Sequence, residues 1–225
     1  VTTVVGFLLA VVLGVGCAVG IVYSRFLDRT LYTLLVALNA VPKVALAPLF
    51  VIWLGTEAKP KIAIAMMIAI FPILVDTVHG LKSIDPEMIN MARAGHASSA
   101  KTLWKIRFPN ALPSIFAGMK VGISLALVGA IVGEFVAGSS GLGHVILVAQ
   151  GGFDTPRIFV ALVLLGILGT LLFNIIDWLE GFVVPWHVSH RSERSAEGLR
   201  LPRTNGVAAN VTTRPALGQA QSERE

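Results

Sequence analysis

The residues from Ser83 to Pro113 read SIDPEMINMARAGHASSAKTLWKIRFPNALP, a long polar stretch between apolar segments. Asp85 is a residue type that favours the N-cap of a helix, and Pro86 suits the first helical position, where its missing N–H would have no partner. Gly95 and His96 then interrupt the helical pattern. The stretch therefore begins with a predicted short helix that ends in a break at these two residues.

A second short helix is predicted after the break. Either Ser98 or Ser99 can cap it, since a serine hydroxyl accepts a hydrogen bond from a free N–H of the first turn. Lys101 and Lys105 are four residues apart and therefore share a face. Proline has no N–H and clashes with the preceding turn, so we expect this helix to end at Pro109.

A series of motifs runs through this stretch and continues beyond it. The motifs are Asp85-Pro86-Glu87, Ala92-Arg93, Ala97-Ser98, Lys101-Thr102, Phe108-Pro109, Ala111-Leu112-Pro113, Gly133-Glu134-Phe135, Ser140-Gly141-Leu142-Gly143, Phe153-Asp154-Thr155-Pro156 and Pro185-Trp186-His187. Their order resembles that of ABC importer permease subunits, the inner-membrane components of binding-protein-dependent transport systems, in the nitrate/sulfonate/taurine branch. The resemblance covers most of residues 30–187. Two departures lie in the family's "EAA" loop: Asn90-Met91 replaces Glu-Ala, and His96 replaces a glycine, with Gly95 one position early.

The resemblance implies a mechanical role for residues 83–110, which we call the central loop. In the family, separate cytoplasmic ABC ATPase subunits grip this loop, and a periplasmic or lipid-anchored solute-binding protein delivers the solute. The residues that the resemblance assigns to ATPase coupling are Ala92, Arg93, Gly95, His96, Ala97, Ser98, Lys101, Thr102 and Pro109. Two interpretations of the alanines stay open: a close fit against the partner's groove, or packing against the protein's own spans.

The composition is that of a membrane protein. Of the 225 residues, 55% are hydrophobic and 14% are charged, whereas soluble domains carry about 25% charged residues. Apolar segments of sufficient length predict an all-α, polytopic helical membrane protein with five spans, at residues 4–23, 31–54, 61–79, 112–137 and 158–184. Through the resemblance, residues 1–187 form a type I ABC importer transmembrane domain. That family usually has six spans, so we expect the first helix to be missing and Val1 not to be the natural start.

Positive charge predicts the orientation, because lysine and arginine accumulate in cytoplasmic segments. The central loop and its flanks hold Lys82, Arg93, Lys101, Lys105 and Arg107, and the tail of residues 188–225 is rich in arginine. Both segments are therefore predicted to be cytoplasmic. The tail has no hydrophobic periodicity and is predicted to be disordered. The predicted location is the bacterial inner (plasma) membrane, crossed several times.

Polar residues and prolines within predicted spans are candidates for a transport pathway or gate. Polar groups inside a membrane need partners from protein or water, so they seldom face lipid. The candidates are Asn39, Pro42, Pro48 and Glu134. For the residues of the second span, a simple packed kink is an equal alternative. For Glu134 we favour a carboxylate that accepts N–H groups of the following glycine-rich loop over one that contacts solute.

Three further charged residues lie in or near predicted spans. We expect Lys120 to snorkel to the cytoplasmic face, because a long flexible stem lets an ammonium group reach the interface. Asp177 and Glu180 are near the cytoplasmic end of the last span and are expected at the interface.

The sequence indicates neither an enzyme nor a cofactor. No Ser/His/Asp or Cys/His set can be assembled, and the histidines, including His187 and His190, lack the context of a metal site. The segment Gly95–Thr102 departs from a phosphate-binding loop because Ala100 replaces the second glycine and no strand precedes it. ATP hydrolysis is therefore assigned to another chain. The basic residues are scattered, which argues against nucleic acid as a partner.

The favoured hypothesis is a transport subunit that forms the pathway for a small solute such as nitrate, a sulfonate or a taurine-like organic anion. Five spans are too few to enclose a pathway, so a second copy of the permease is expected in a two-fold homodimer within membrane lipid. One alternative is a stand-alone channel or secondary transporter, for which inverted repeats or ionisable groups at mid-membrane would be needed. Another is a non-transporting membrane anchor subunit.

Overall fold

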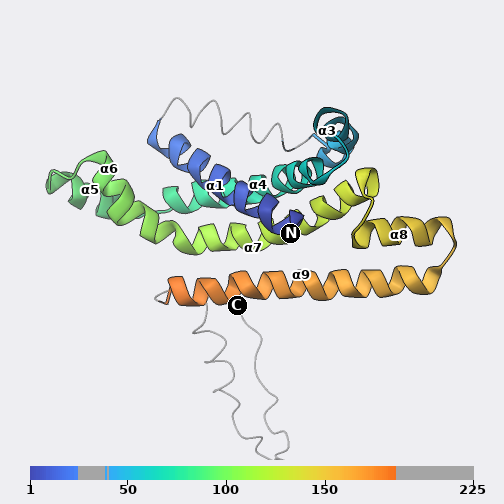
Figure 1. Ribbon diagram of the computed structural model, residues 1–225. Helices are drawn as coiled ribbons and strands as arrows, with labels where there is room; N and C mark the ends of the chain where they lie inside the picture. The colour runs from blue at the N-terminus through green and yellow to red at the C-terminus, as the bar shows by residue number, and fades with distance from the viewer. Residues whose placement is uncertain (25–38, 40, 186–225) are drawn as a thin grey trace, which may run out of the picture. The chain divides into compact units, whose positions relative to one another are not determined.

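The computed structural model describes residues 1–24, 39 and 41–185, and every regular element among them is helical (Figure 1). The elements are α1 (Thr2–Tyr23), η1 (Lys43–Leu46), α3 (Ala47–Leu54), α4 (Ala58–Lys82), α5 (Pro86–Ala94), α6 (Ser99–Thr102), η2 (Leu103–Arg107), α7 (Phe108–Ala137), α8 (Leu142–Gly151) and α9 (Thr155–Val183). The predicted all-α fold is confirmed for these residues. The predicted disordered tail, residues 188–225, lies outside them.

Within the described residues, four helical stretches are long and apolar enough to cross a membrane: Thr2–Tyr23, Ala58–Lys82, Ser99–Ala137 and Thr155–Val183. They correspond to four of the predicted spans. Two of the predicted spans are too short on the side of the central loop. The span predicted to end at residue 79 continues to Lys82, and the span predicted to begin at residue 112 belongs to a helical stretch that begins at Ser99. The remaining predicted span, 31–54, includes residues 31–38 and 40, which lie outside the described residues. Its described part contains η1 and α3, a shorter apolar stretch.

Small residues bring α4 and α7 into close contact along their length. A Cβ added at Gly129 would lie 2.7 Å from the Cα of Ala65, and one added at Gly133 would lie 2.9 Å from the Cα of Lys61. Helices in a bilayer gain little from the hydrophobic effect, and they associate where small side chains let the backbones approach. The glycines of α7 therefore mark the surface that packs on α4, and we call this contact the α4–α7 seam.

The helix α1 packs against the same pair. Phe7 and Ala10 join a buried cluster with residues of α4 and α7, and Gly6 approaches Ala65, with a distance of 2.8 Å from an added Cβ to the Ala65 Cβ. In contrast, Gly16 and Gly20 have no atom within 4 Å of an added Cβ among the described residues. Their GxxxG spacing therefore does not coincide with a described contact.

The last helix has few buried residues. Only Ala161, Ile176 and Glu180 are buried among the 29 residues of α9, which contacts α7 and α8. Its first turn is fixed by Asp154, whose carboxylate accepts a hydrogen bond from the Arg157 N–H. Most of the apolar surface of α9 therefore faces outward.

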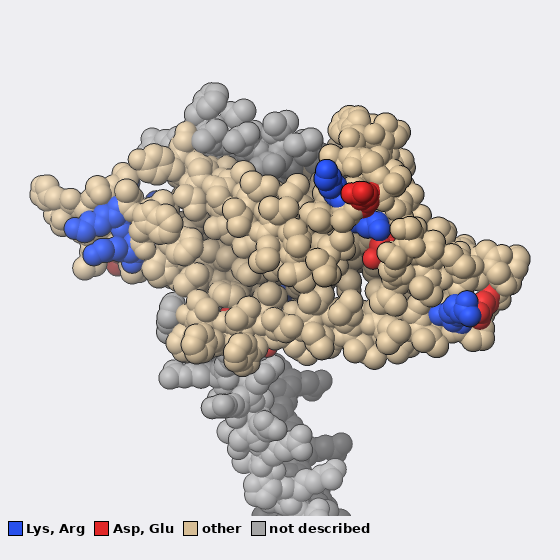
Figure 2. All heavy atoms as spheres, in the orientation of Figure 1, with Lys and Arg blue, Asp and Glu red and all other residues tan. Residues whose placement is uncertain are grey.

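The described surface has the charge distribution of a membrane protein. Figure 2 shows charged side chains near the two ends of the helices and a broad, largely uncharged surface between them. This distribution fits helices whose middle parts are surrounded by lipid, because charged side chains are costly there and accumulate at the water interfaces.

The close contact at the α4–α7 seam can be tested by replacing one of its glycines with a larger residue. Gly129→Val should force the helices apart, and overpacking of this kind costs about 1–3 kcal/mol. The thermal unfolding midpoint of the purified protein in detergent should therefore fall. Gly166→Val is the matched control, because no atom lies within 4 Å of an added Cβ at Gly166. Equal midpoints for the two variants would contradict the close contact at Gly129.

Candidate functional site

The central loop begins with a capped helix. The Asp85 carboxylate accepts a hydrogen bond from the Glu87 N–H at 2.9 Å, and Pro86 lies in the first turn of α5. Glu87 places a negative charge near the positive end of the helix dipole. The predicted N-cap is therefore confirmed, and a local hydrogen bond sets where the loop helix starts.

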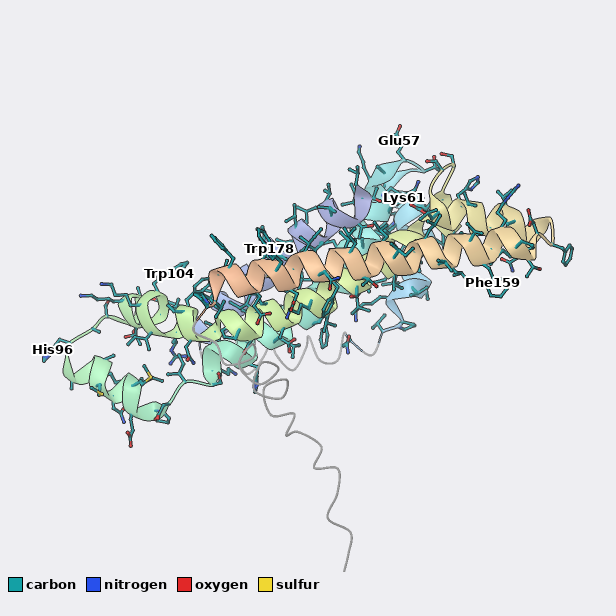
Figure 3. The ribbon with its side chains drawn as sticks, turned by 90° about the horizontal axis from the view of Figure 1, so that it is seen from below. Glu57, Lys61, His96, Trp104, Phe159 and Trp178 are labelled. Atoms are coloured by element: carbon teal, nitrogen blue, oxygen red, sulfur yellow. The ribbon has the colours of Figure 1, made fainter. Side chains whose placement is uncertain are left out.

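The break after α5 lies at the predicted residues. Gly95 keeps a negative φ of −79°, whereas His96 has a φ of 53°, in the left-handed region. His96 therefore adopts the backbone conformation that a glycine would reach with less strain. Figure 3 shows His96 at the tip of the loop, away from Lys61 at the other end of α4. Ala92, one turn before the tip, is half-buried.

The second loop helix is capped by Ser98 rather than by Ser99. The Ser98 hydroxyl accepts a hydrogen bond from the Lys101 N–H at 3.3 Å, and the Thr102 hydroxyl donates to the Ser98 carbonyl at 3.2 Å. Thr102 is buried, whereas Ser98 and Lys101 are exposed. The two loop helices are thus held by side-chain caps, which makes the central loop an ordered element.

The prediction that Pro109 ends the second helix is wrong. The helical stretch runs on from Ser99 to Ala137. In η2, a π-helical turn, the Phe108 N–H donates to the Leu103 carbonyl five residues earlier. This wider turn lets Pro109, which has no N–H to donate, lie in the first turn of α7. The central loop is therefore continuous with a long apolar helix.

The two faces of α5 have different surroundings. Met88 and Met91 point outward, with exposed fractions of 49% and 75%. On the other face, Ile89 and Arg93 line a cavity together with Ala97, which follows the break. Ala97 therefore lines a cavity of the protein itself, whereas Met88 and Met91 form an exposed apolar surface.

Three of the four pathway candidates lie near the start of the described part of the second predicted span. Asn39 lines a cavity of about 350 Å³ between α1, η1 and α4. Its side-chain oxygen accepts a hydrogen bond from Lys43, whose Nζ also lies 5.0 Å from the centroid of the Phe71 ring. Pro42 precedes η1, and Pro48 lies in the first turn of α3, where proline is tolerated. Neither proline interrupts a described helix.

Glu134, the fourth candidate, holds the glycine-rich connection after α7. Its Oε2 accepts a hydrogen bond from the Gly143 N–H at 2.7 Å. Gly141 has a φ of 113°, and a Cβ added there would lie 2.3 Å from the Glu134 carboxylate. The predicted anchoring role of Glu134 is confirmed. Glycine is required at position 141 because other residues rarely adopt this backbone conformation, and because the carboxylate occupies the space that a Cβ would need.

Lys120, which is predicted to snorkel to the interface, has partners in α9 that the sequence analysis does not predict. Its ammonium group pairs with both Asp177 and Glu180 of α9, and the Nζ lies 2.5 Å from the Glu180 Oε2. Glu180 is buried among the protein's own residues. The available sequence signal is the three-residue spacing of Asp177 and Glu180, which places both carboxylates on one face of the helix. The sequence alone does not indicate that a lysine of α7 lies opposite.

Comparisons with known proteins agree with this arrangement. A family model described as "Binding-protein-dependent transport system inner membrane component" matches residues 10–186. The riboflavin transport system permease protein RibX of Chloroflexus aurantiacus is 42% identical over 167 residues, which cover 74% of this chain and 62% of that protein. The putative aliphatic sulfonates transport permease protein SsuC of Escherichia coli is 32% identical over 167 residues, with coverages of 74% and 64%. The chain thus matches less than two thirds of the length of these two relatives.

A solved structure has the same fold. A chain of the MetNI methionine ABC transporter, in an inward-facing conformation, superposes with a TM-score of 0.71, and the match covers 81% of this chain and 91% of that chain. The sequence identity is 21%, so this likeness concerns the fold alone.

The ion pairs of Lys120 give a stability test. Lys120→Met removes the cation and leaves Glu180 buried without it, and breaking a buried pair by removing one partner costs about 3–5 kcal/mol. We expect a lower thermal unfolding midpoint in detergent, partly restored by the additional change Glu180→Gln. Lys105→Met, which removes an exposed lysine, serves as the control. A Lys120→Met midpoint equal to that of the control would rule out a stabilising pair between α7 and α9.

Proposed function

Because the chain belongs to the family of binding-protein-dependent transport system inner membrane components, we propose that it is the membrane-spanning permease subunit of an ATP-driven ABC importer. The observation that carries the proposal is the central loop, an ordered helix–break–helix element that joins two long apolar helices, α4 and α7. A motion imposed on such a loop passes directly into the α4–α7 seam.

The proposed partners follow from this function. Cytoplasmic ABC ATPase subunits would bind the central loop and hydrolyse ATP, and a periplasmic or lipid-anchored solute-binding protein would deliver the solute on the opposite side. A second copy of the permease would complete the pathway as a homodimer. The outward apolar surface of α9, of which only three residues are buried, supports contact with a second copy or with membrane lipid.

The proposed solute is a small molecule such as nitrate, a sulfonate or a taurine-like organic anion. The names of two relatives, an aliphatic sulfonates permease and a riboflavin permease, support a small organic solute. Lys43 adds a physical argument, because it brings a positive charge to a mainly apolar cavity next to the pathway candidate Asn39. A cation beside an apolar surface suits an anion that has an apolar part.

We assign ATPase docking to the outward face of α5 and to the tip at His96. Met88 and Met91 offer exposed apolar surface there, and flexible methionine side chains adapt well to a partner's groove. Arg93, Ala97 and Thr102 line the cavity on the inner side instead. Their proposed contribution to coupling is to hold the loop in a fixed position against α1 and α7. A movement of the docked ATPase would then also move these helices.

A charge placed on the docking face tests this assignment. Met91→Glu should bury an unpaired carboxylate against the ATPase, which costs several kcal/mol, on the order of a hundredfold or more in affinity. The expected result is a normal amount of permease in the membrane, with ATPase co-purification and solute uptake lost. Uptake is measured in cells that carry the whole transporter, and co-purification is measured through a tagged permease.

Met91→Leu is the matched control, because it keeps an apolar side chain of similar size, and it should transport normally. Normal uptake by Met91→Glu would remove the docking role from this face. Normal uptake without any ATPase would instead favour a stand-alone channel or secondary transporter. ATPase binding without uptake in the unaltered protein would favour an anchor subunit.

The proposed orientation places the central loop and the C-terminus in the cytoplasm of a bacterial cell, with the protein in the inner membrane. Ser98 and Ser140 lie at opposite ends of α7 and can report on this orientation. In a Cys17→Ala background, which removes the only cysteine, Ser140→Cys should react with a membrane-impermeant maleimide in intact cells, and Ser98→Cys should react only after lysis. The reverse pattern would refute the orientation.

A further inference from the structure

A polar cavity lies between the end of α1 and the central loop. Its volume is about 290 Å³, and it is lined by Val22, Tyr23, Ile89, Arg93, Ala97, Ser99, Thr102, Leu103 and Arg107. The lining comes from α1, from both loop helices and from η2, so the cavity connects segments that are far apart in the sequence. Figure 2 shows Lys and Arg side chains gathered at the end of the molecule that carries these loop elements.

The two arginines of the cavity bring positive charge to it, with no acidic partner among the described residues. Neither Arg93 nor Arg107 forms an ion pair with an acidic side chain in the described part of the chain. Arg107 makes a long hydrogen bond, 3.4 Å, from its Nη1 to the Leu81 carbonyl. A guanidinium group has five N–H donors, so most donors of both side chains remain available. Such a pair of guanidinium groups around a polar space suits an oxyanion that accepts several hydrogen bonds.

The place of the cavity in the fold favours a phosphate group as that oxyanion. Tyr23 is the last residue of α1, one of the helices long enough to cross a membrane. Trp104, on η2, has an exposed fraction of 61% and lies 5.2 Å from Phe108, centroid to centroid. Tyrosine and tryptophan collect at the level of lipid headgroups. The cavity therefore lies where a spanning helix ends, on the opposite side of α5 from the outward methionines.

We propose that this cavity is a binding site for a phosphate group, held by Arg93 and Arg107. The same chemistry is offered by the headgroup of an anionic phospholipid and by free inorganic phosphate. The cavity has room for either group, and basic sites at the cytoplasmic ends of spanning helices attract anionic lipid. A bound phosphate would connect Arg93 of α5 with Arg107 of η2 and so fix the first loop helix relative to the start of α7.

The proposal is tested by binding, without the ATPase, so that its failure is separate from failure of the transport function. The full chain is purified in neutral detergent and titrated with phosphatidylglycerol, with phosphatidylcholine and with inorganic phosphate. Retained lipid is counted by native mass spectrometry, and the unfolding midpoint is followed in parallel. We expect phosphatidylglycerol to bind with one molecule per chain at this site and to raise the midpoint, and phosphatidylcholine to do neither.

Variants locate the binding. Arg93→Gln and Arg107→Gln should each weaken phosphatidylglycerol binding about fivefold, the usual contribution of one basic residue near an anionic surface. Ala97→Leu should weaken it by filling the cavity without changing any charge. Lys105→Gln removes the same charge from an exposed lysine outside the lining and should bind as the unaltered protein does. Because Arg93 and Lys105 are both exposed, their replacement leaves the helix packing in place.

The outcomes separate the sources of the phosphate. Saturable binding of inorganic phosphate that is lost in Arg93→Gln, with no phosphatidylglycerol effect, would assign the site to free phosphate and support the proposal. Equal phosphatidylglycerol binding by Arg93→Gln, Ala97→Leu and Lys105→Gln would show only diffuse attraction and overturn it. The proposal also fails if neither phosphatidylglycerol nor inorganic phosphate binds to the unaltered protein.

Discussion

The close approach of α4 and α7 is the constraint on which the other described elements depend. Glycine and alanine along the seam bring the two backbones together, and the distances from an added Cβ at Gly129 and Gly133 to the α4 backbone are below 3 Å. Lipid tails are as apolar as leucine, so this contact rests on van der Waals packing rather than on burial from water. The central loop joins the ends of the same two helices. A rigid seam therefore gives the loop a fixed base, and a displaced loop acts on both helices together.

Polar contacts position the elements that the seam does not hold. Glu134 ties the glycine-rich connection back to the end of α7, and Lys120 joins α9 to α7 through Asp177 and Glu180. A charge inside a spanning region is costly when alone and acceptable when paired. The three groups carry one positive and two negative charges, so their pairing makes the contact of α9 with α7 specific in position. This matters because so little of α9 is buried.

The sequence predicted what depends on nearby residues. The cap at Asp85, the cap at either Ser98 or Ser99 and the break at Gly95 and His96 involve partners within a few positions, and the Glu134 contact spans nine residues. The failures involve longer-range context. The sequence predicts that Pro109 ends a helix because a regular α-helix would require its N–H, and the π-helical turn that removes this requirement has no local signature. The sequence does not predict the partners of Lys120, because they lie 57 and 60 residues later and only the packing of α9 on α7 brings them near.

The Lys120 contact has a consequence for biosynthesis. A chain made from its N-terminus presents α7 to the insertion machinery before Asp177 has been translated, 57 residues after Lys120. Until then the ammonium group in α7 has no carboxylate from α9, and the insertion of an unpaired lysine into the apolar region is unfavourable. The pairing that positions α9 on α7 therefore forms only after α9 has been synthesised.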